Sequence, residues 1–216
     1  MNSKINLATY LRRIGFEGKP AVDIETLRVL QELHTQAIPF ENLNPLLGLP
    51  ILLDIKSLQK KLLADKRGGY CFEQNILFQH VLETIGFKVK GLAARVIQGG
   101  VEGHISPRTH MLLLVTVDKV LFVADVGFGG MTPTTPLLLE ANEMQDTTLE
   151  PFRLDRDGDN YILQANVDDN WKSLYRFDLE EQFLPDYEVA NWYTSANPAS
   201  HFLSNLLVSR TAHDRR

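Results

Sequence analysis

The hydrophobic periodicity of this 216-residue chain changes once, near residue 86, and this change restricts its fold more than any other feature. Before that point, apolar side chains recur at helical spacing in segments separated by capping and breaking residues. From about Val89 the apolar segments are short, rich in β-branched or aromatic residues, and bounded by turn residues. The sequence therefore predicts an α+β protein in which helices precede an antiparallel sheet or small barrel.

The boundaries of the elements follow from the same pattern. Four helices are expected: one over residues 6–13 that ends at Gly15, two that are N-capped by Asp23 and Asp54, and one from Cys71 to Gly86. The expected strands are 92–97, 111–117, 120–126, 161–167 and 171–177. Residues 183–216 are less regular, and a further helix is expected to begin within 198–203.

Charge and cysteine content exclude several classes of protein. The chain has 22 Lys and Arg residues and 27 Asp and Glu residues, so it lacks the broad positive field of a nucleic-acid-binding protein. No apolar run approaches the roughly 18–20 residues of a membrane span, and no secretory signal is visible at the amino terminus. The single cysteine, Cys71, rules out an intrachain disulfide and indicates a reducing, cytoplasmic setting.

The surroundings of Cys71 suggest a reactive position. Gly68, Gly69 and Tyr70 precede it, and it opens the fourth expected helix. The first N–H groups of a helix lack internal partners and carry partial positive charge, so a thiolate placed there is stabilised. The two glycines allow a sharp turn and close access to the sulfur. The alternative is a buried structural cysteine, because free cysteines are among the most buried residues.

A thiolate nucleophile usually works with an imidazole that a third group orients. Among the six histidines, His110 is the strongest candidate because it directly precedes an expected strand. The other five are expected in helices, in a glycine-flanked loop or in the charged tail: His34, His80, His104, His201 and His213.

Strand pairing supplies a partner for His110. A two-residue turn at 118–119 places Leu112 opposite Asp125, so His110 and Asp125 share a face as diagonal neighbours about 7–8 Å apart at the backbone. A carboxylate in such an apolar strand is costly to bury without a partner. The alternative is that Asp125 caps the turn after the strand. The pairing favours a Cys71–His110–Asp125 triad that transfers an acyl group through a thioester.

No metal site is expected. The histidines form no helical His-x-x-x-His pair. The acidic run 155–160 lacks the glycine and glutamate positions of an EF-hand loop, and we expect a hairpin turn centred on Asp157 and Gly158.

Five segments together resemble the arylamine N-acetyltransferase family. They are RGGYCFEQN at 67–75, RTHMLLL at 108–114, VADVGFGG at 123–130, PFENL at 39–43 and NWY at 191–193. The resemblance implies a helical bundle, an antiparallel β-barrel and a papain-like arrangement of the cysteine triad. It also implies a cytosolic enzyme that moves acetyl from acetyl-coenzyme A to arylamines, arylhydroxylamines or hydrazines by a ping-pong route, without a metal.

The resemblance assigns roles to individual residues. Cys71 matches the nucleophile, His110 the base and Asp125 the residue that orients it. Residues near the coenzyme A arm and phosphates would be Thr109, Gly129 and Gly130. The aromatic lining of the acceptor pocket would be Phe40, Phe128 and Phe202, which without the family would be taken as core residues. Glu41 and Arg67 match positions that form a structural ion pair.

The resemblance also implies a division of the chain into a helical bundle at 1–86, a β-barrel at 87–190 and, at 191–216, the start of an interdomain helix and lid. Family members carry a third, α/β lid domain, and this sequence ends where that domain should begin. We therefore expect the lid to be largely absent, with exposed apolar surface that favours homo-oligomers.

Two other functions share these features. One is a cysteine hydrolase or amide synthase with the same triad, and the other is a lidless scaffold that binds ligands but turns over slowly. A hydrolase must admit water, whereas a transferase must keep its thioester dry until an amine arrives.

Overall fold

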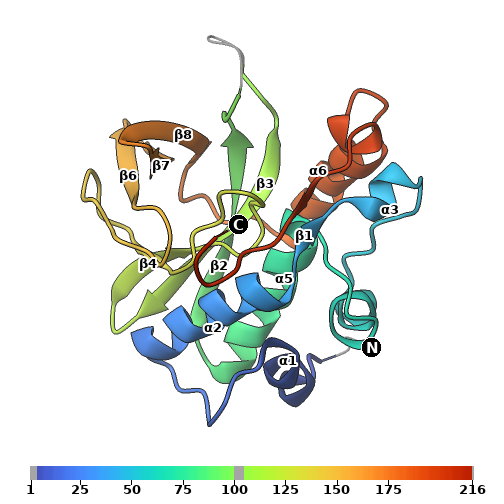
Figure 1. Cartoon of the computed structure of the whole chain (residues 1–216), viewed down its shortest axis with the longest axis horizontal. Helices are drawn as coiled ribbons and strands as arrows, with labels where there is room; N and C mark the ends of the chain where they lie inside the picture. Colours follow the sequence, from blue (N-terminus) through green and yellow to red (C-terminus); the bar gives the residue numbers. More distant parts are fainter. Residues whose placement is uncertain (1–3, 100–104, 216) are drawn as a thin grey trace.

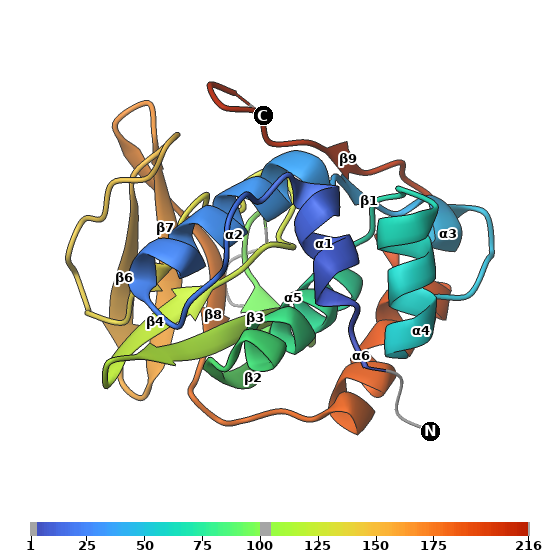
Figure 2. The same cartoon turned by 90° about the horizontal axis from the view of Figure 1, so that it is seen from below.

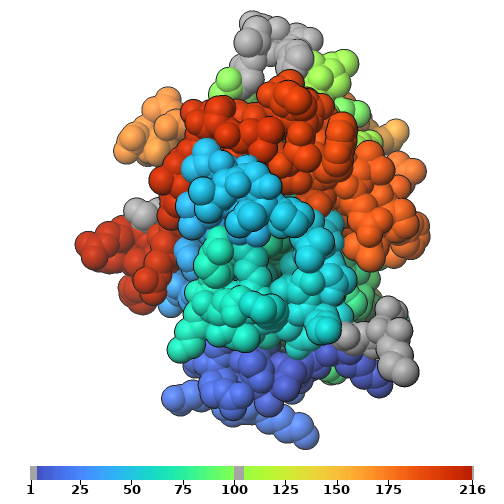
Figure 3. Space-filling view, turned by 90° about the vertical axis from the view of Figure 1, so that its right-hand side faces the viewer, coloured from blue at the N-terminus to red at the C-terminus, as the bar shows by residue number. Residues whose placement is uncertain are grey.

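The computed structural model describes residues 4–99 and 105–215 and shows helices packed against a β-barrel (Figure 1). Three helices form the centre of the helical part: α1 (Leu7–Ile14), α2 (Ile24–Ala37) and α5 (Cys71–Ile85). Figure 2 shows α2 lying across this part beside α1. Two shorter helices, α3 (Leu43–Leu46) and α4 (Ile55–Leu58), lie on the face shown in Figure 3. The π-helix η1 (Gln59–Ala64) directly continues α4.

Capping residues set the ends of these helices. Asn6 and Asp23 each accept a hydrogen bond from the N–H group three residues further on, at 3.0 and 2.7 Å. Gly15 and Gly86 end α1 and α5 with φ angles of 76° and 116°, in the left-handed region that favours glycine. The four predicted helices are confirmed, and α3 is an addition that the break at residues 38–42 concealed.

Seven antiparallel strands form a nearly closed barrel. In chain order they are β2 (Lys88–Val96), β3 (Arg108–Val117), β4 (Val120–Ala124), β5 (Leu137–Leu138), β6 (Phe152–Asp157), β7 (Asn160–Val167) and β8 (Asn170–Phe177). Their spatial order is β5-β4-β3-β2-β8-β7-β6, and bridges from residues 141 and 145 link the segment after β5 to β6. The predicted α+β class with an antiparallel barrel is confirmed.

Strand β3 joins the two parts because both of its faces are apolar. Met111, Leu113 and Val115 pack into the helical core, whereas Leu112 and Leu114 pack inside the barrel. Side chains alternate along a strand, so His110 points to the same side as Leu112. The alternation therefore presents His110 on the barrel side of β3.

The β6–β7 hairpin differs from the prediction. Asp157 pairs with Asn160, so the turn residues are Gly158 and Asp159, and the predicted pair of Asp157 and Gly158 is wrong by one residue. Gly158 has a φ of 61°, which suits glycine at the first central position of a two-residue turn. Strand β6 was also not predicted, because only Phe152 and Leu154 mark its apolar face.

The region after residue 183 differs most. Helix α6 (Leu184–Ala196) begins seven residues before the region in which the resemblance implied an interdomain helix. Only a 3₁₀ turn, η2 (His201–Leu203), forms where the pattern of residues 198–203 predicted a helix. The buried residues of α6 are Tyr187, Asn191 and Thr194, so the helix has no apolar stripe to reveal it. The proposed division of the chain stays a prediction, and its boundary at 190 lies within α6.

Beyond α6 the chain returns to the helical part. Strand β9 (Val208–Ser209) pairs antiparallel with β1 (Phe40–Glu41). Figure 1 shows this red segment running beside β1, close to the start of α5. The residues that follow α6 are thereby placed next to Cys71.

One buried histidine belongs to the helical core. His34 of α2 is fully buried, with Nδ1 2.9 Å from the Tyr10 hydroxyl and Nε2 3.2 Å from Gln74 Oε1. Burial lowers the pKa of His34 to about 3, so the imidazole is neutral at physiological pH.

Acidification is expected to destabilise this core. Between the ordinary pKa of 6.5 and the folded-state value of about 3, the unfolded chain binds a proton at His34 and the folded chain does not. The free energy of unfolding therefore falls as the pH drops through this window. Between pH 7 and pH 5, the wild-type protein should lose about 2 kcal/mol more of this free energy than His34→Gln does. Urea unfolding of both proteins at the two pH values measures the difference, and equal losses would contradict it.

Candidate active site

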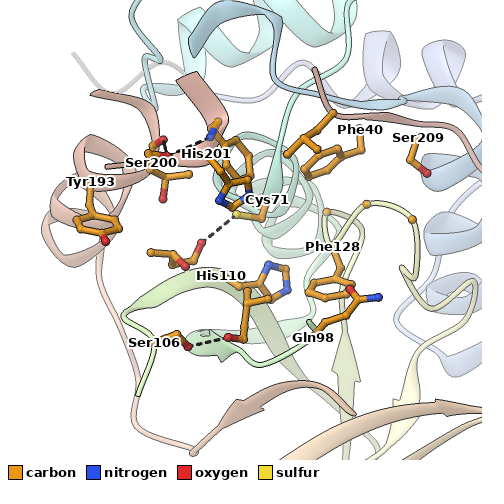
Figure 4. Close-up of a pocket in the computed structure, with 18 of the residues that line it drawn as sticks. Phe40, Cys71, Gln98, Ser106, His110, Phe128, Tyr193, Ser200, His201 and Ser209 are labelled. Atoms are coloured by element: carbon orange, nitrogen blue, oxygen red, sulfur yellow. Dashed lines mark hydrogen bonds between the residues drawn. The ribbon is translucent and has the colours of Figure 1, made fainter. Parts of the chain in front are cut away.

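Cys71 is the first residue of α5, and the turn before it packs tightly against the start of β1. Only glycine fits at Gly68, because a Cβ there would collide with the Pro39 carbonyl oxygen. The Cys71 side chain is 5% exposed and points toward His110 (Figure 4). Its sulfur lies 3.5 Å from the Thr109 carbonyl oxygen, and Cys71 and His110 line the same cavity.

His110 and Asp125 meet as the hairpin pairing predicts. His110 Nε2 lies 2.7 Å from Asp125 Oδ2, and Leu113 stands opposite Ala124 in the expected register. The turn residues 118 and 119 have φ angles of 50° and 68°, which suit a type I′ hairpin. Strand β4 ends at Ala124, so Asp125 follows the strand rather than lying inside it. The structure thus brings the three predicted side chains together.

The carboxylate of Asp125 is completely buried and accepts four hydrogen bonds. Oδ2 accepts from His110 and from the Tyr175 hydroxyl at 3.0 Å, while Oδ1 accepts from Asn75 Nδ2 at 3.0 Å and Gly127 N at 2.9 Å. The sequence analysis assigned no role to Asn75 or Tyr175. Asn75 could have been found, because it lies one helical turn after Cys71 on the same face of α5.

Two aromatic rings pack against the imidazole and against each other, with their own centroids 5.1 Å apart. The centroids of Phe128 and Tyr175 lie 5.1 and 4.7 Å from that of His110, which is 2% exposed. With Nε2 engaged by Asp125, the ring nitrogen that remains for Cys71 is Nδ1. The ring is therefore fixed in orientation, with one nitrogen assigned to each neighbour.

The pair formed by His110 and Asp125 is ionic. Burial alone would lower the pKa of His110, but the Asp125 carboxylate, with a smaller contribution from Cys71, raises it to about 10. Burial alone would raise the pKa of Asp125, but the imidazolium and the N–H donors around it hold this pKa below its ordinary value. At neutral pH the site therefore holds a protonated imidazole in the same cavity as the sulfur.

Ion pairs fix the turn that carries Cys71. Arg67 Nη2 lies 2.7 Å from Glu41 Oε1, so the expected structural ion pair is present. Lys61 of η1 lies 2.7 Å from Glu73 Oε1, and the other Glu73 oxygen accepts from Tyr70 N. These charged groups bond to one another and to the backbone of the turn, whereas the sulfur bonds to the Thr109 carbonyl oxygen.

A cavity of about 640 Å³ opens above Cys71 and His110 (Figure 4). All six predicted binding residues line it: Phe40, Thr109, Phe128, Gly129, Gly130 and Phe202. The structure places them there, and their individual roles stay predictions.

Residues after α6 form one wall of this cavity, and the sequence analysis missed most of them. His201, Leu206 and Val208 are among the lining residues. Asn42, which is fully buried, holds this wall: its Nδ2 donates to the carbonyl oxygens of residues 202 and 205, and its Oδ1 accepts from Leu207 N.

Among the described residues, no histidine other than His110 bonds to Asp125. His34 lies in the helical core, and His80 and His213 lie outside the cavity. His104 lies outside the described residues.

Neither a metal cluster nor a membrane span is found in the described part of the chain. Residues 4–99 and 105–215 place no three His, Cys, Asp or Glu side chains together where they could hold a metal ion. Within the same residues, every helix is too short or too polar to cross a bilayer.

Comparison with known proteins gives consistent results. A family model described as N-acetyltransferase matches residues 23–216. The arylamine N-acetyltransferase of Mycolicibacterium smegmatis is 43% identical, over 98% of this chain and 78% of its own length. That of Escherichia coli is 45% identical, over 95% of this chain and 73% of its own. The structure of Mycobacterium marinum arylamine N-acetyltransferase in complex with CoA superposes on this chain with a TM-score of 0.94 and 42% sequence identity. The match covers 97% of this chain and 78% of the M. marinum chain.

Proposed function

The chain belongs to the arylamine N-acetyltransferase family and is an acyltransferase, and from this premise we propose that it transfers acetyl from acetyl-coenzyme A to aromatic amines or hydrazines through a Cys71 thioester. The observation that carries the proposal is the buried His110–Asp125 pair, which lies with Cys71 in the lining of one cavity of about 640 Å³. The bound CoA in the M. marinum relative supports the donor.

In the first half-reaction, the Cys71 thiolate attacks the carbonyl carbon of the acetyl thioester and a carbon–sulfur bond forms. The bond to the sulfur of coenzyme A then breaks, and His110 gives its proton to that sulfur as it leaves. Asp125 keeps the imidazole oriented and stabilises its charge throughout. Thr109, Gly129 and Gly130 are the residues we assign to the coenzyme arm.

In the second half-reaction, the amine nitrogen attacks the thioester carbon, and the bond from that carbon to Cys71 Sγ breaks. The neutral imidazole of His110 accepts the proton that the nitrogen loses, which restores the starting ion pair. The same histidine therefore serves as acid in one half-reaction and as base in the other.

The cavity suits an uncharged aromatic acceptor. Its described lining residues include no Asp, Glu, Lys or Arg, so a cationic amine would lose its hydration without gaining a charged partner. Phe40 and Phe202 lie edge to face with centroids 6.4 Å apart, and Phe128 lies against His110. We assign these three rings to acceptor binding, because aryl rings pack well in this geometry.

Intact mass measurement tests the proposal. After exposure to acetyl-coenzyme A alone, the protein should gain one acetyl group, and an arylhydrazine should then remove it and form the acetylated product. Continued release of free coenzyme A thiol without amine would indicate a hydrolase. No mass gain would indicate a binding scaffold.

Gly127→Ala is expected to lower the rate of acetyl transfer by about 100-fold, because a shift of about 1 Å in a reacting group has effects of this size. A Cβ at this position would lie 2.7 Å from Cys71 Cα and 2.9 Å from Asn75 Nδ2, so the turn carrying Asp125 must move away from α5. The measurement is the rate of Cys71 acetylation by quenched-flow mass spectrometry.

Val115→Ala is the control for Gly127→Ala, since it weakens the same core without touching the triad. Both variants should have lower melting temperatures, but only Gly127→Ala should be slow at temperatures where each protein is folded. An equal loss of rate in both would mean that close packing at Gly127 is unimportant for the chemistry.

A further inference from the structure

A buried chain of hydrogen bonds runs from the helical core to the turn that precedes Cys71. The Tyr10 hydroxyl lies 2.9 Å from His34 Nδ1, and His34 Nε2 lies 3.2 Å from Gln74 Oε1. Gln74 Nε2 then donates to the Gly69 carbonyl oxygen at 2.8 Å. The side chains of Tyr10 and His34 are fully buried, and that of Gln74 is 1% exposed. The chemistry proposed for the active site uses none of these three side chains.

The direction of every hydrogen bond in this chain is fixed. The Gly69 carbonyl can only accept, so Gln74 presents its NH₂ group to it and its oxygen to His34. His34 must then carry its hydrogen on Nε2, which leaves Nδ1 to accept from the Tyr10 hydroxyl. Because burial lowers the pKa of His34 to about 3, this tautomer persists over the whole neutral range.

The Gly69 carbonyl is where the chain meets the active site. It also accepts from Glu41 N at 3.0 Å, and Gly69 N donates to the Pro39 carbonyl oxygen at 3.2 Å. These bonds join the turn before Cys71 to strand β1, which carries Phe40 into the cavity. The position of one carbonyl therefore affects both the sulfur and an aromatic ring of the cavity.

We propose that Gln74, oriented by His34 and Tyr10, is a positioning residue that sets the Gly69 carbonyl and through it the placement of Cys71 and Phe40. The proposal rests on Cys71 being the nucleophile of the proposed function. Apolar side chains could fill this part of the core without the desolvation of three polar groups. They could not fix the carbonyl, and that specific contact is what the polar chain supplies.

Gln74→Met tests the role, because methionine keeps the approximate length of glutamine and removes both hydrogen bonds. The rate of Cys71 acetylation should fall by about 100-fold, the size of effect that small displacements of reacting groups produce. The matched control is Gln31→Met. Gln31 is also fully buried and also donates from Nε2 to a backbone carbonyl, but its acceptor is Pro133 and not the turn before Cys71. Its acetylation rate should stay close to wild type.

A second variant separates positioning from stability. In Gln74→Glu, a protonated carboxyl group can still donate to Gly69 and accept from His34, whereas the ionised form cannot donate. Its acetylation rate relative to wild type should therefore fall as the pH rises from 6 to 9, a trend that a general loss of packing would not produce. His34→Gln, which keeps a donor for Gln74, should be faster than His34→Leu.

The outcomes are distinct. Wild-type rates in Gln74→Met, equal losses in Gln74→Met and Gln31→Met, or a flat pH ratio in Gln74→Glu would each overturn the proposal. If the wild-type protein gains no acetyl group, the proposed function fails. The rate of Cys71 alkylation by iodoacetamide in the same variants then decides the positioning role by itself. If Gln74→Met does not fold, the two His34 variants decide it.

Discussion

Cys71→Ser is expected to abolish acetyl transfer, with a fall of about 10⁴-fold or more in turnover. Serine preserves the size of the side chain, but its hydroxyl keeps its proton beside an imidazole that Asp125 already holds in the protonated state. The site then has neither a thiolate nor a free base, so the carbonyl carbon meets no nucleophile. Release of coenzyme A thiol in the presence of an arylhydrazine measures the effect, and intact mass should show no acetylated protein.

Cys71→Ala serves as the companion variant, because it removes the nucleophile without adding a hydroxyl. Both variants should melt close to the wild-type temperature, since the hydrogen bond they remove, from the sulfur to the Thr109 carbonyl oxygen, is long at 3.5 Å. Acetylated protein in either variant would show that another side chain carries the acetyl group.

Asp125→Asn is expected to lower the rate of both half-reactions by about 10³–10⁴-fold. The carboxylate raises the pKa of His110 to about 10, and a neutral amide cannot do this. The amide also brings an NH₂ group to a place where every neighbour donates: Tyr175, Asn75 and Gly127 N on the two oxygens. The imidazole is then left without its counter-charge, and the amide cannot accept all four bonds.

The pH dependence identifies the mechanism of this loss. In the wild type, the His110 charge should persist until the pH approaches 10, whereas in Asp125→Asn it should disappear at a lower pH. NMR titration of the His110 ring measures both. Asp178→Asn is the control, because that carboxylate pairs with Arg108 and takes no part in the triad. Wild-type turnover in Asp125→Asn would remove Asp125 from the mechanism.

The sequence was sufficient to predict that Cys71, His110 and Asp125 lie together, because the signals for their placement are local. His110 and Asp125 lie on one hairpin, and the two-residue turn at 118–119 leaves a single register. Cys71 was recognisable because a glycine turn opens its helix. Both signals depend on residues that are close in the sequence, where spacing determines geometry.

The parts that escaped prediction depend on contacts distant in the sequence. Tyr175 reaches Asp125 only because β8 pairs with β2 as the barrel closes, and nothing in the strand itself marks that residue. Helix α6 buries Tyr187, Asn191 and Thr194, whose positions are set by their partners and not by an apolar stripe. One of those partners is Tyr70, the residue before Cys71, whose hydroxyl donates to Asn191.

The wall that Asn42 holds has a consequence for how this protein is made. Asn42 and Leu207 are bonded across 165 residues of chain. During synthesis, the segment carrying Cys71 leaves the ribosome long before residues 201–209 exist to cover it. A nascent chain therefore presents an open thiol to cellular oxidants and electrophiles, and protection comes only after residues 201–209 have left the ribosome.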